Sequence, residues 1–395
     1  MVEDAPLSDV NPYLSQDIWF EILKNLPVKT LGKCRCVCKS WRSLIVSPTF
    51  MSAHLKHYTQ NNANSLILYK KKSENGYTYN EHCVQFRDSD KLKEQNSICD
   101  YTWPYFHQFC FVYGLLCLFN NDNLGRSTPI LIWNPILEKC ITLPRTTIRD
   151  TVSVVGFGYD CRKSDHRVVV IYFSSTETPL VEVFSVQERT RRIISADYLV
   201  DNSIISHGYL TSANCFVNGF IHWFFWDIKF RPKALLLFNV SDDKFETMEL
   251  PEAITIMEKV ESFSIFEHQG MLSVSHCDLL HYWKIRCQIW VKREYNDATS
   301  WLKILDVMPL LGLSHTLPLH YKDKNGELIE LTKKFSDGAM YLDMTNNGHL
   351  KELGFRITQY TTRLSAYSES LVFLDQQISD YTDDYAQLRW YLLAN

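Results

Sequence analysis

The chain has 395 residues, and this length predicts two or three ordinary domains, or a small module attached to one large all-β body. With 46% hydrophobic and 13% aromatic residues, the chain can form a large buried core, which excludes a disordered or collagen-like protein. The 41 Lys and Arg residues are outnumbered by 45 Asp and Glu, so the net charge of -4 provides no overall attraction to nucleic acid or to an anionic membrane.

The N-terminal residues show no export signal. Residues 1–15 contain Glu3, Asp4 and Asp9 and have no apolar central stretch, so we expect no signal peptide and treat residues 1–11 as a flexible arm. The longest apolar run, 109–119, is 11 residues long, whereas a membrane-spanning helix needs about 20. We therefore expect an intracellular protein, in the cytoplasm and/or the nucleus, with no membrane partner.

Residues 12–50 have the pattern of three short amphipathic helices. The first begins after Ser15, a favourable N-cap, and ends before Pro27. Asp17, Glu21 and Lys24 occupy its polar face, and the opposite face carries Ile18, Trp19, Ile22, Leu23 and Leu26. The second helix carries Leu31 and Cys34, and the third, with Val37, Trp41, Leu44 and Ile45, ends before Pro48.

About 40 residues do not usually form a self-sufficient core. Because these three helices display wide apolar faces, they need a partner surface. That surface is either the remainder of the same chain or another protein.

The same segment closely resembles the F-box. The resemblance is carried by the whole segment from residue 14 to residue 50, including the turn LPVKTL at residues 26–31 and the stretch VCKSWR at residues 37–42. An F-box ordinarily opens with Leu-Pro, and here Ser15 stands in place of that proline. The resemblance implies that the module binds a Skp-type adaptor and, through it, a cullin scaffold with its RING subunit.

The resemblance also implies which residues contact the adaptor. They are Leu14, Asp17, Ile18, Ile22, Leu23, Leu26, Pro27, Leu31, Cys34, Val37, Cys38 and Trp41. Ten Lys and Arg and no Asp or Glu lie between Ile22 and Ser73, which favours an acidic protein partner over nucleic acid.

The twelve cysteines are interpreted as reduced side chains of the core. Cys34, Cys36 and Cys38 form a C-x-C-x-C run without the second ligand pair that a zinc site needs, and the other His/Cys cluster spans residues 276–287. We therefore expect no metal and no cofactor.

From residue 64 onward, short apolar runs separated by turn residues predict many strands. One unit recurs as an apolar run ending in an aromatic residue, and the steps between successive aromatics are 51, 54, 52 and 51 residues. These aromatics are Trp133, Phe184, Phe238, Trp290 and Tyr341. A period near 50 with about four strands is typical of a propeller blade, so each aromatic is expected to pack between blades.

Two further strands are left over, at 65–71 and 370–374, and together they are expected to form a closing blade from both ends of the chain. The sequence thus predicts a mainly β protein with a small α module, in which a three-helix F-box precedes a β-propeller-like domain of about six blades. Five or seven blades remain open.

The repeats also resemble the plant F-box-associated domain, a kelch-like group that includes S-locus F-box proteins. The resemblance covers roughly residues 105–375 and is carried by the strings WNP at 133–135, GFGYD at 156–160 and NGFIHW at 218–223. The expected organisation is an F-box at 12–50, a linker at 51–63, a propeller at 64–377 and a tail at 378–395.

The sequence contains no complete catalytic motif of the hydrolase, metalloprotease or nucleotide-binding type. The glycines of GFGYD are interpreted as close-packing positions, and His222 as a core histidine with satisfied hydrogen bonds.

We therefore expect a non-catalytic substrate-recognition subunit of a Skp-cullin-F-box ubiquitin ligase, which binds an unknown protein target for degradation. The alternative is a propeller that acts as a ubiquitin-independent binding module or an enzyme. For the target, the loop around residue 230 has the composition of a binding hot spot, with Trp226, Asp227, Phe230 and Arg231.

Overall fold

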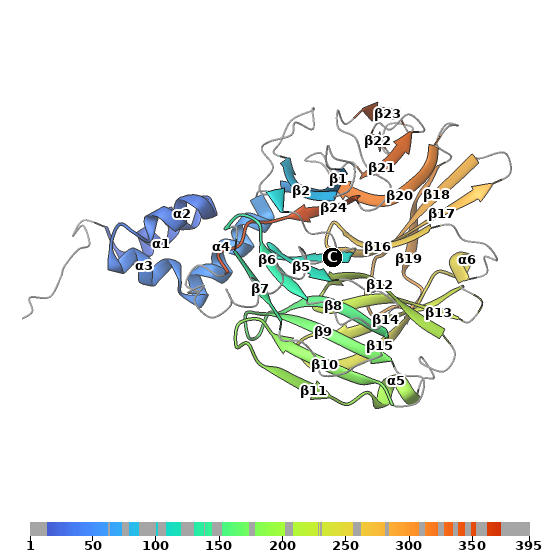
Figure 1. Ribbon diagram of the computed structural model, residues 1–395, viewed down its shortest axis with the longest axis horizontal. Helices are drawn as coiled ribbons and strands as arrows, with labels where there is room; N and C mark the ends of the chain where they lie inside the picture. The colour runs from blue at the N-terminus through green and yellow to red at the C-terminus, as the bar shows by residue number, and fades with distance from the viewer. Residues whose placement is uncertain are drawn as a thin grey trace, which may run out of the picture.

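The computed structural model describes residues 14–61, 64–72, 79–86, 100–101, 108–119, 130–137, 139–143, 152–173, 178–201, 208–227, 229, 231–255, 262–280, 284–307, 313–322, 328–334, 339–343, 349–352 and 362–372. Within these ranges, four helices precede six four-stranded antiparallel sheets, and the helices project from one side of the sheets (Figure 1). None of the helices described is long and apolar enough to cross a bilayer.

The four N-terminal helices, named here the helical module, are α1 (Gln16–Lys24), α2 (Val28–Cys34), α3 (Lys39–Ile45) and α4 (Pro48–Asn61). The Ser15 hydroxyl accepts a hydrogen bond from the Ile18 amide at 3.4 Å, so Ser15 is the N-cap of α1, as expected. The Cys38 sulfur accepts from the Trp41 amide and caps α3 in the same way. Three helices therefore form where the sequence predicts them.

The expected linker at 51–63 is instead helical as far as Asn61. Pro48 begins this helix, because proline fits the first turn of a helix, where its missing N–H has no intrahelical partner. The Ser47 hydroxyl accepts from the Phe50 amide at 3.2 Å, which caps this helix. Phe50, His54 and Tyr58, four residues apart, form its buried stripe.

The six sheets each contain four strands in the following orders. The first sheet is β4 (Gln108–Val112), β5 (Leu115–Phe119), β6 (Leu131–Asn134) and β7 (Lys139–Thr142); the second is β8 (Val152–Asp160), β9 (Asp165–Phe173), β10 (Leu180–Ser185) and β11 (Arg191–Ile194). The third is β12 (Gly208–Val217), β13 (Phe220–Asp227), β14 (Pro232–Asn239) and β15 (Lys244–Glu249); the fourth is β16 (Ser262–His268), β17 (Met271–Leu280), β18 (Lys284–Lys292) and β19 (Trp301–Val307).

The fifth sheet is β20 (Leu313–Lys322), β21 (Leu328–Lys334), β22 (Ala339–Asp343) and β23 (His349–Glu352). The closing sheet is β24 (Thr362–Tyr367), β1 (Asn64–Lys72), β2 (Tyr79–Phe86) and β3 (Asp100–Tyr101). Two short helices, α5 (Asp197–Asp201) and α6 (Glu252–Thr255), follow the second and third sheets.

The sheets form a closed ring. The first strand of each sheet contacts the first strand of the next, in the order β4, β8, β12, β16, β20, β24 and back to β4. This is the arrangement of a β-propeller. The closing sheet combines both ends of the chain, since β24 pairs with β1. The C-terminal strand of this sheet is Thr362–Tyr367 and not the expected 370–374, because 368–372 packs elsewhere as irregular backbone.

The recurring aromatics lie on the third strand of their sheets, at Trp133, Phe184, Phe238, Trp290 and Tyr341. Phe184 packs into a core shared by the first and second sheets, and Phe238 into one shared by the second and third. A side chain on Gly156 of β8 would overlap the Trp223 ring of the third sheet. The glycine in GFGYD therefore allows two sheets to approach closely, whereas the sequence indicated close packing within a strand.

Candidate functional site: the helical module and its junction with the propeller

The helical module exposes three large apolar side chains. Ile18 and Ile22, one turn apart on α1, are 45% and 44% exposed, and Val37 between α2 and α3 is 67% exposed. We call these three residues the apolar patch. Trp41 is half-buried, and its ring lies 4.9 Å from that of Trp19.

The other residues expected at an adaptor interface divide by burial. Leu23 and Leu31 are fully buried, and Asp17 is exposed. The half-buried ones, besides Trp41, are Leu14, Leu26, Pro27, Cys34 and Cys38. In this chain Leu23 and Leu31 therefore belong to an internal core, against which Leu26, Cys34 and Trp41 also pack, and the large apolar side chains that remain exposed are those of the apolar patch.

That internal core is shared with the propeller. Leu23, Val28 and Leu31 of the module belong to the same buried cluster as Trp133 of the first sheet and Leu371 near the C-terminus. Apolar side chains of the module thus pack on its own chain, while the three residues of the apolar patch lie outside this core and are exposed.

Residues 368–372, named here the C-terminal clip, lie at this junction. The Glu369 carboxylate accepts a hydrogen bond from the Val28 amide at 2.9 Å, and Glu369 is 3% exposed. The Asn134 side-chain amide donates to the carbonyl oxygens of Ser370 and Val372, each at 2.9 Å. Gly114, at φ +81°, lies so close that a side chain there would collide with the clip.

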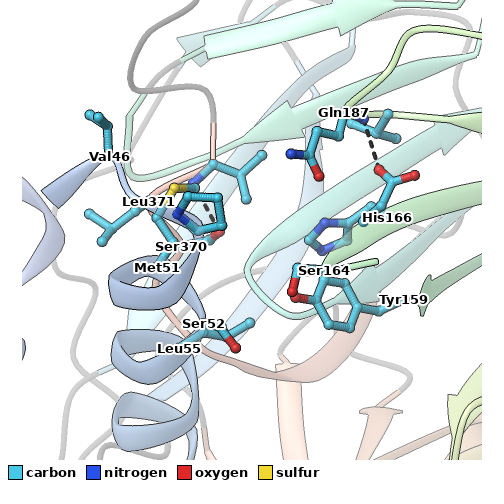
Figure 2. A pocket seen from close by; sticks show the side chains of 14 residues that line it. Val46, Met51, Ser52, Leu55, Tyr159, Ser164, His166, Gln187, Ser370 and Leu371 are labelled. Atoms are coloured by element: carbon cyan, nitrogen blue, oxygen red, sulfur yellow. Dashed lines mark hydrogen bonds between the residues drawn. The ribbon is translucent and has the colours of Figure 1, made fainter. Parts of the chain in front are cut away.

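A cavity of about 210 Å³ separates α4 from the second sheet. Figure 2 shows Met51, Ser52 and Leu55 of α4 on one side of this cavity and Tyr159 and His166 on the other. The His166 ring donates to the Val112 carbonyl oxygen at 3.1 Å, and burial lowers the pKa of His166 to about 4. Its imidazole is therefore neutral and engaged at neutral pH.

The nearby Asp165 carboxylate also has partners. It accepts from the Ser185 hydroxyl at 2.6 Å and from the Gln187 amide at 2.8 Å, and burial raises the pKa of Asp165. These hydrogen bonds join the start of β9 to the end of β10. Asp165 therefore has a structural role beside the cavity, and its contacts do not resemble those of a catalytic acid or base.

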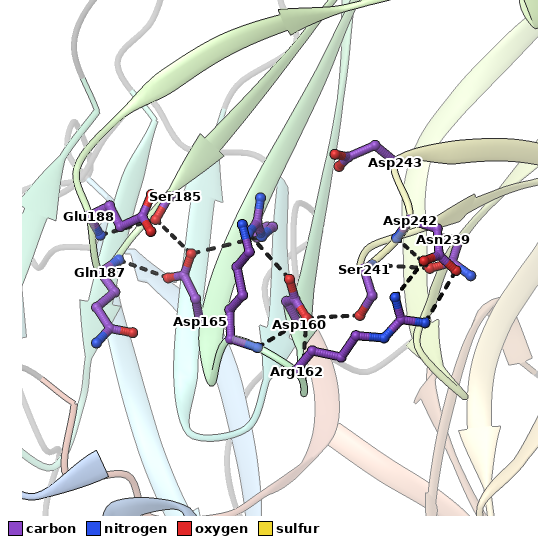
Figure 3. Close-up of polar contacts among 12 residues, drawn as sticks. Asp160, Arg162, Asp165, Ser185, Gln187, Glu188, Asn239, Ser241, Asp242 and Asp243 are labelled. Carbon is purple, nitrogen blue, oxygen red and sulfur yellow. Dashed lines mark hydrogen bonds and ion pairs between the residues drawn. The ribbon is translucent and has the colours of Figure 1, made fainter.

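A buried ion pair and its neighbours join the second and third sheets (Figure 3). The Arg167 guanidinium lies 3.2 Å from the Asp160 carboxylate, and both side chains are buried. Asp160 also accepts from the Ser241 hydroxyl at 2.8 Å, while Arg162 pairs with Asp242 at 2.6 Å. Asp160 of the GFGYD string therefore fixes one sheet to the next.

The loop proposed for target binding is tied internally. The Asp227 carboxylate accepts two hydrogen bonds from the Arg231 guanidinium, at 2.9 and 2.7 Å, and these bonds contribute to lowering the pKa of Asp227. The Trp226 ring is half-buried and packs edge-on against Phe263. Phe230 lies outside the described residues. The loop is thus braced by an ion pair, and Trp226 is partly a packing residue.

His222 is a buried histidine with both ring nitrogens engaged. Its Nδ1–H donates to the Cys215 carbonyl oxygen at 3.2 Å, so Nε2 accepts from the Tyr295 hydroxyl at 2.6 Å. Burial lowers the pKa of His222 to about 4 and raises that of Tyr295. This is the core histidine inferred from the sequence. Among the described residues, no three His, Cys, Asp or Glu side chains are grouped as a metal site requires.

Comparison with known families identifies the propeller. Residues 28–376 match the family model described as "F-box associated beta propeller domain". The chain belongs to this family.

Relatives of this F-box associated propeller are found in Arabidopsis thaliana. The chain is 26% identical to "F-box protein CPR1" over 356 residues, which is 80% of this chain and 79% of that protein. It is 22% identical to "F-box/kelch-repeat protein At3g23880" over 301 residues, 73% of this chain and 77% of that protein. The family match begins at Val28, so Ile18 and Ile22 of α1 precede it.

Proposed function

We propose that this F-box associated propeller is the substrate-recognition subunit of a Skp-cullin-F-box ubiquitin ligase. In this proposal the helices at 14–50 are an F-box that binds a Skp-type adaptor, and the six sheets are six blades that hold a protein target. The cullin scaffold and RING subunit join through the adaptor, and catalysis belongs to other subunits, in the cytoplasm or nucleus. The observation that carries the proposal is the exposure of the apolar patch on a module whose other apolar side chains already pack against the propeller.

The apolar patch is large enough to contribute measurably to binding. Full burial of an Ile or Val side chain contributes about 1.5–3 kcal/mol, so covering three side chains that are about half exposed contributes about 3 kcal/mol. That energy corresponds to roughly 100-fold in affinity. The half-buried Trp41 beside Trp19 adds aromatic area of the kind that dominates interfaces.

Charge on the module supports an acidic partner. Lys29 and Lys33 of α2 and Lys39 of α3 are exposed, and the acidic side chains described in the module are Asp17 and Glu21 on α1. Glu21 is already paired with Lys24 at 2.7 Å. Positive charge on the module raises the association rate with an acidic partner, and this increase becomes smaller as salt is added.

The test uses the full-length chain and a purified Skp-type adaptor. Ile22→Asp would place a charge in the apolar patch, and we expect at least 100-fold weaker adaptor binding. Ile193→Asp is the matched control, because Ile193 is 64% exposed on β11 of the propeller. Equal adaptor binding by Ile22→Asp and the wild type, or an equal loss in Ile193→Asp, would contradict the proposal.

Loop 226–232 is the proposed target-contacting segment. The Asp227–Arg231 ion pair joins its two sides, which lowers the entropy that these two side chains lose on binding. The Arg231 side chain is still 43% exposed, so its outer face can contact a target.

The alternative is a ubiquitin-independent propeller, and protease sensitivity near residues 58–61 does not separate it from the proposed function. Tyr58 is buried in α4, and the module packs on the first sheet, so protection of this segment is compatible with both functions. Adaptor binding is therefore the measurement that separates them.

A further inference from the structure

Two residues near opposite ends of the described chain, Val28 and Glu369, meet at the N-terminus of α2. Val28 is the first residue of this helix, and its amide is one of the first-turn donors that have no partner within a helix. Pro27, at the N-cap position, makes no side-chain cap. The Glu369 carboxylate, 341 residues away along the chain, accepts from the Val28 amide and provides the missing cap.

The C-terminal clip is also fixed to the propeller. Asn134 binds it through two donated hydrogen bonds, and its own side-chain oxygen accepts from the Leu137 amide at 3.2 Å. Ser370 and Leu371 are each 2% exposed, and Leu371 packs in the core that joins module and propeller. The clip therefore contacts both bodies through buried polar and apolar groups.

Next to the clip, the module is less closely packed. The cavity of about 210 Å³ lies between α4 and the second sheet, and Ser370 and Leu371 are at its edge (Figure 2). The side chains of α4 that line the cavity lack packing contacts across it. The orientation of the module rests on its contact with the first sheet and on the clip.

We propose that the C-terminal clip is the joint that sets the orientation of the helical module relative to the propeller, with Glu369 as its positioning residue. Its consequence for ubiquitin transfer rests on the proposed function. If the adaptor is bound to the module and the target to the propeller, the joint determines which lysines come within reach of the conjugating enzyme. Loosening it changes the geometry of transfer and leaves both binding surfaces intact.

The test compares three substitutions in the full-length chain. Glu369→Ala removes the cap on Val28, whereas Glu369→Gln keeps an accepting oxygen and serves as the conservative rescue. Asn134→Asp is nearly isosteric and still accepts from Leu137, but it can no longer donate to the clip. It therefore releases the clip from the propeller side and provides a second route if Glu369→Ala fails to fold.

The first measurement needs no ligase. By amide hydrogen exchange, we expect the Val28 amide to exchange at least 10-fold faster in Glu369→Ala and in Asn134→Asp than in the wild type, with Glu369→Gln close to the wild type. X-ray scattering should show a broader distribution of distances for the first two variants. Unchanged exchange and unchanged scattering in both of these variants would overturn the proposal that the clip orients the module.

The second measurement uses the assembled ligase, with the exposed lysines of the propeller as acceptors because the target is unknown. We expect the modified lysines, located by mass spectrometry, to be redistributed in Glu369→Ala and restored in Glu369→Gln, with adaptor affinity changed less than 2-fold. An identical lysine pattern in the wild type and Glu369→Ala would overturn the positioning role. If the wild type does not bind the adaptor, the proposed function fails. Exchange and scattering still show whether the clip orients the module.

Discussion

Two buried imidazoles make the stability of the propeller depend on pH. His166 of β9 and His222 of β13 are fully buried, and burial lowers the pKa of each to about 4, against 6.5 for an exposed histidine. Hydrogen bonds to backbone carbonyls oppose this shift but do not overcome it. In the unfolded chain both side chains bind a proton near pH 6.5, whereas in the folded chain they remain neutral down to about pH 4.

The sign of the effect follows from this difference. Between about pH 6.5 and pH 4 the unfolded state binds more protons, so the free energy of unfolding falls as the pH falls. A shift of about 2.5 pH units corresponds to about 3 kcal/mol per histidine. The two lie in different sheets, and His166 bonds to Val112 whereas His222 bonds to Cys215 and Tyr295, so their effects add to about 6 kcal/mol. This is comparable to the total stability of many domains.

Two carboxylates with shifted pKa values affect this pH range differently. The raised pKa of Asp165 opposes the trend, because a carboxylate that binds a proton more readily when folded favours the folded state at low pH. Hydrogen bonding from the Arg286 guanidinium lowers the pKa of Asp306, so the stability this pair provides is lost only below about pH 4. The loss between pH 6.5 and 4 is therefore dominated by the histidines.

The measurement is urea unfolding of the full-length chain, followed by tryptophan fluorescence from about pH 7 to about pH 4.5. His166→Gln places an amide donor near the position of Nε2, so it can still bond to the Val112 carbonyl oxygen but cannot titrate. We expect this variant to be less stable at pH 7 and to lose about 3 kcal/mol less stability than the wild type on acidification, because His222 and His54, whose pKa values burial also lowers, still titrate. A wild-type stability that is flat over this range, or an equally steep loss in His166→Gln, would refute the reasoning.

Three further substitutions test the packing and the target loop. Gly156→Ala should destabilise the propeller by about 1–3 kcal/mol and lower its Tm, whereas Gly32→Ala, with open space around it, should not; equal effects would contradict the close packing. Tyr295→Phe removes the donor to His222 and should lower the free energy of unfolding by about 1–3 kcal/mol. An unchanged Tm would argue against this hydrogen bond. Arg231→Ala should change the Tm little because its ion pair is partly exposed, yet it should weaken capture of the target; unaltered capture would move the target site elsewhere.

Much of the fold could be predicted because its signals are local. The helical periods of α1–α3 are set by residues three or four positions apart. Each recurring aromatic ends a short apolar run within its own strand. The sequence does not predict helix α4 if Pro48 is treated only as a helix terminator, although Phe50, His54 and Tyr58 have the spacing of a buried helical face. The signal that could have found it is this spacing together with Ser47 as a cap.

The site could be predicted only in part. Exposure of Ile18 and Ile22 agrees with the apolar face expected from the helical pattern, but no pattern distinguishes them from the buried Leu23 and Leu31, since all four are apolar residues of the module. Which of these residues packs on the propeller depends on the position of the first sheet. That position is fixed by contacts between residues about 100 positions apart.

The location of the joint follows from the way the ring closes. Because β24 pairs antiparallel with β1, Tyr367 at the end of β24 lies opposite Asn64 at the start of β1. Residues before Asn64 lead back to α4 and the helical module, and residues after Tyr367 form the C-terminal clip. A propeller closed from both ends of its chain therefore brings the C-terminal residues beside whatever module precedes the first strand. No local pattern explains why the carboxylate of Glu369 is buried. The topology does, because it brings Glu369 to the module, where the carboxylate holds Val28 in place.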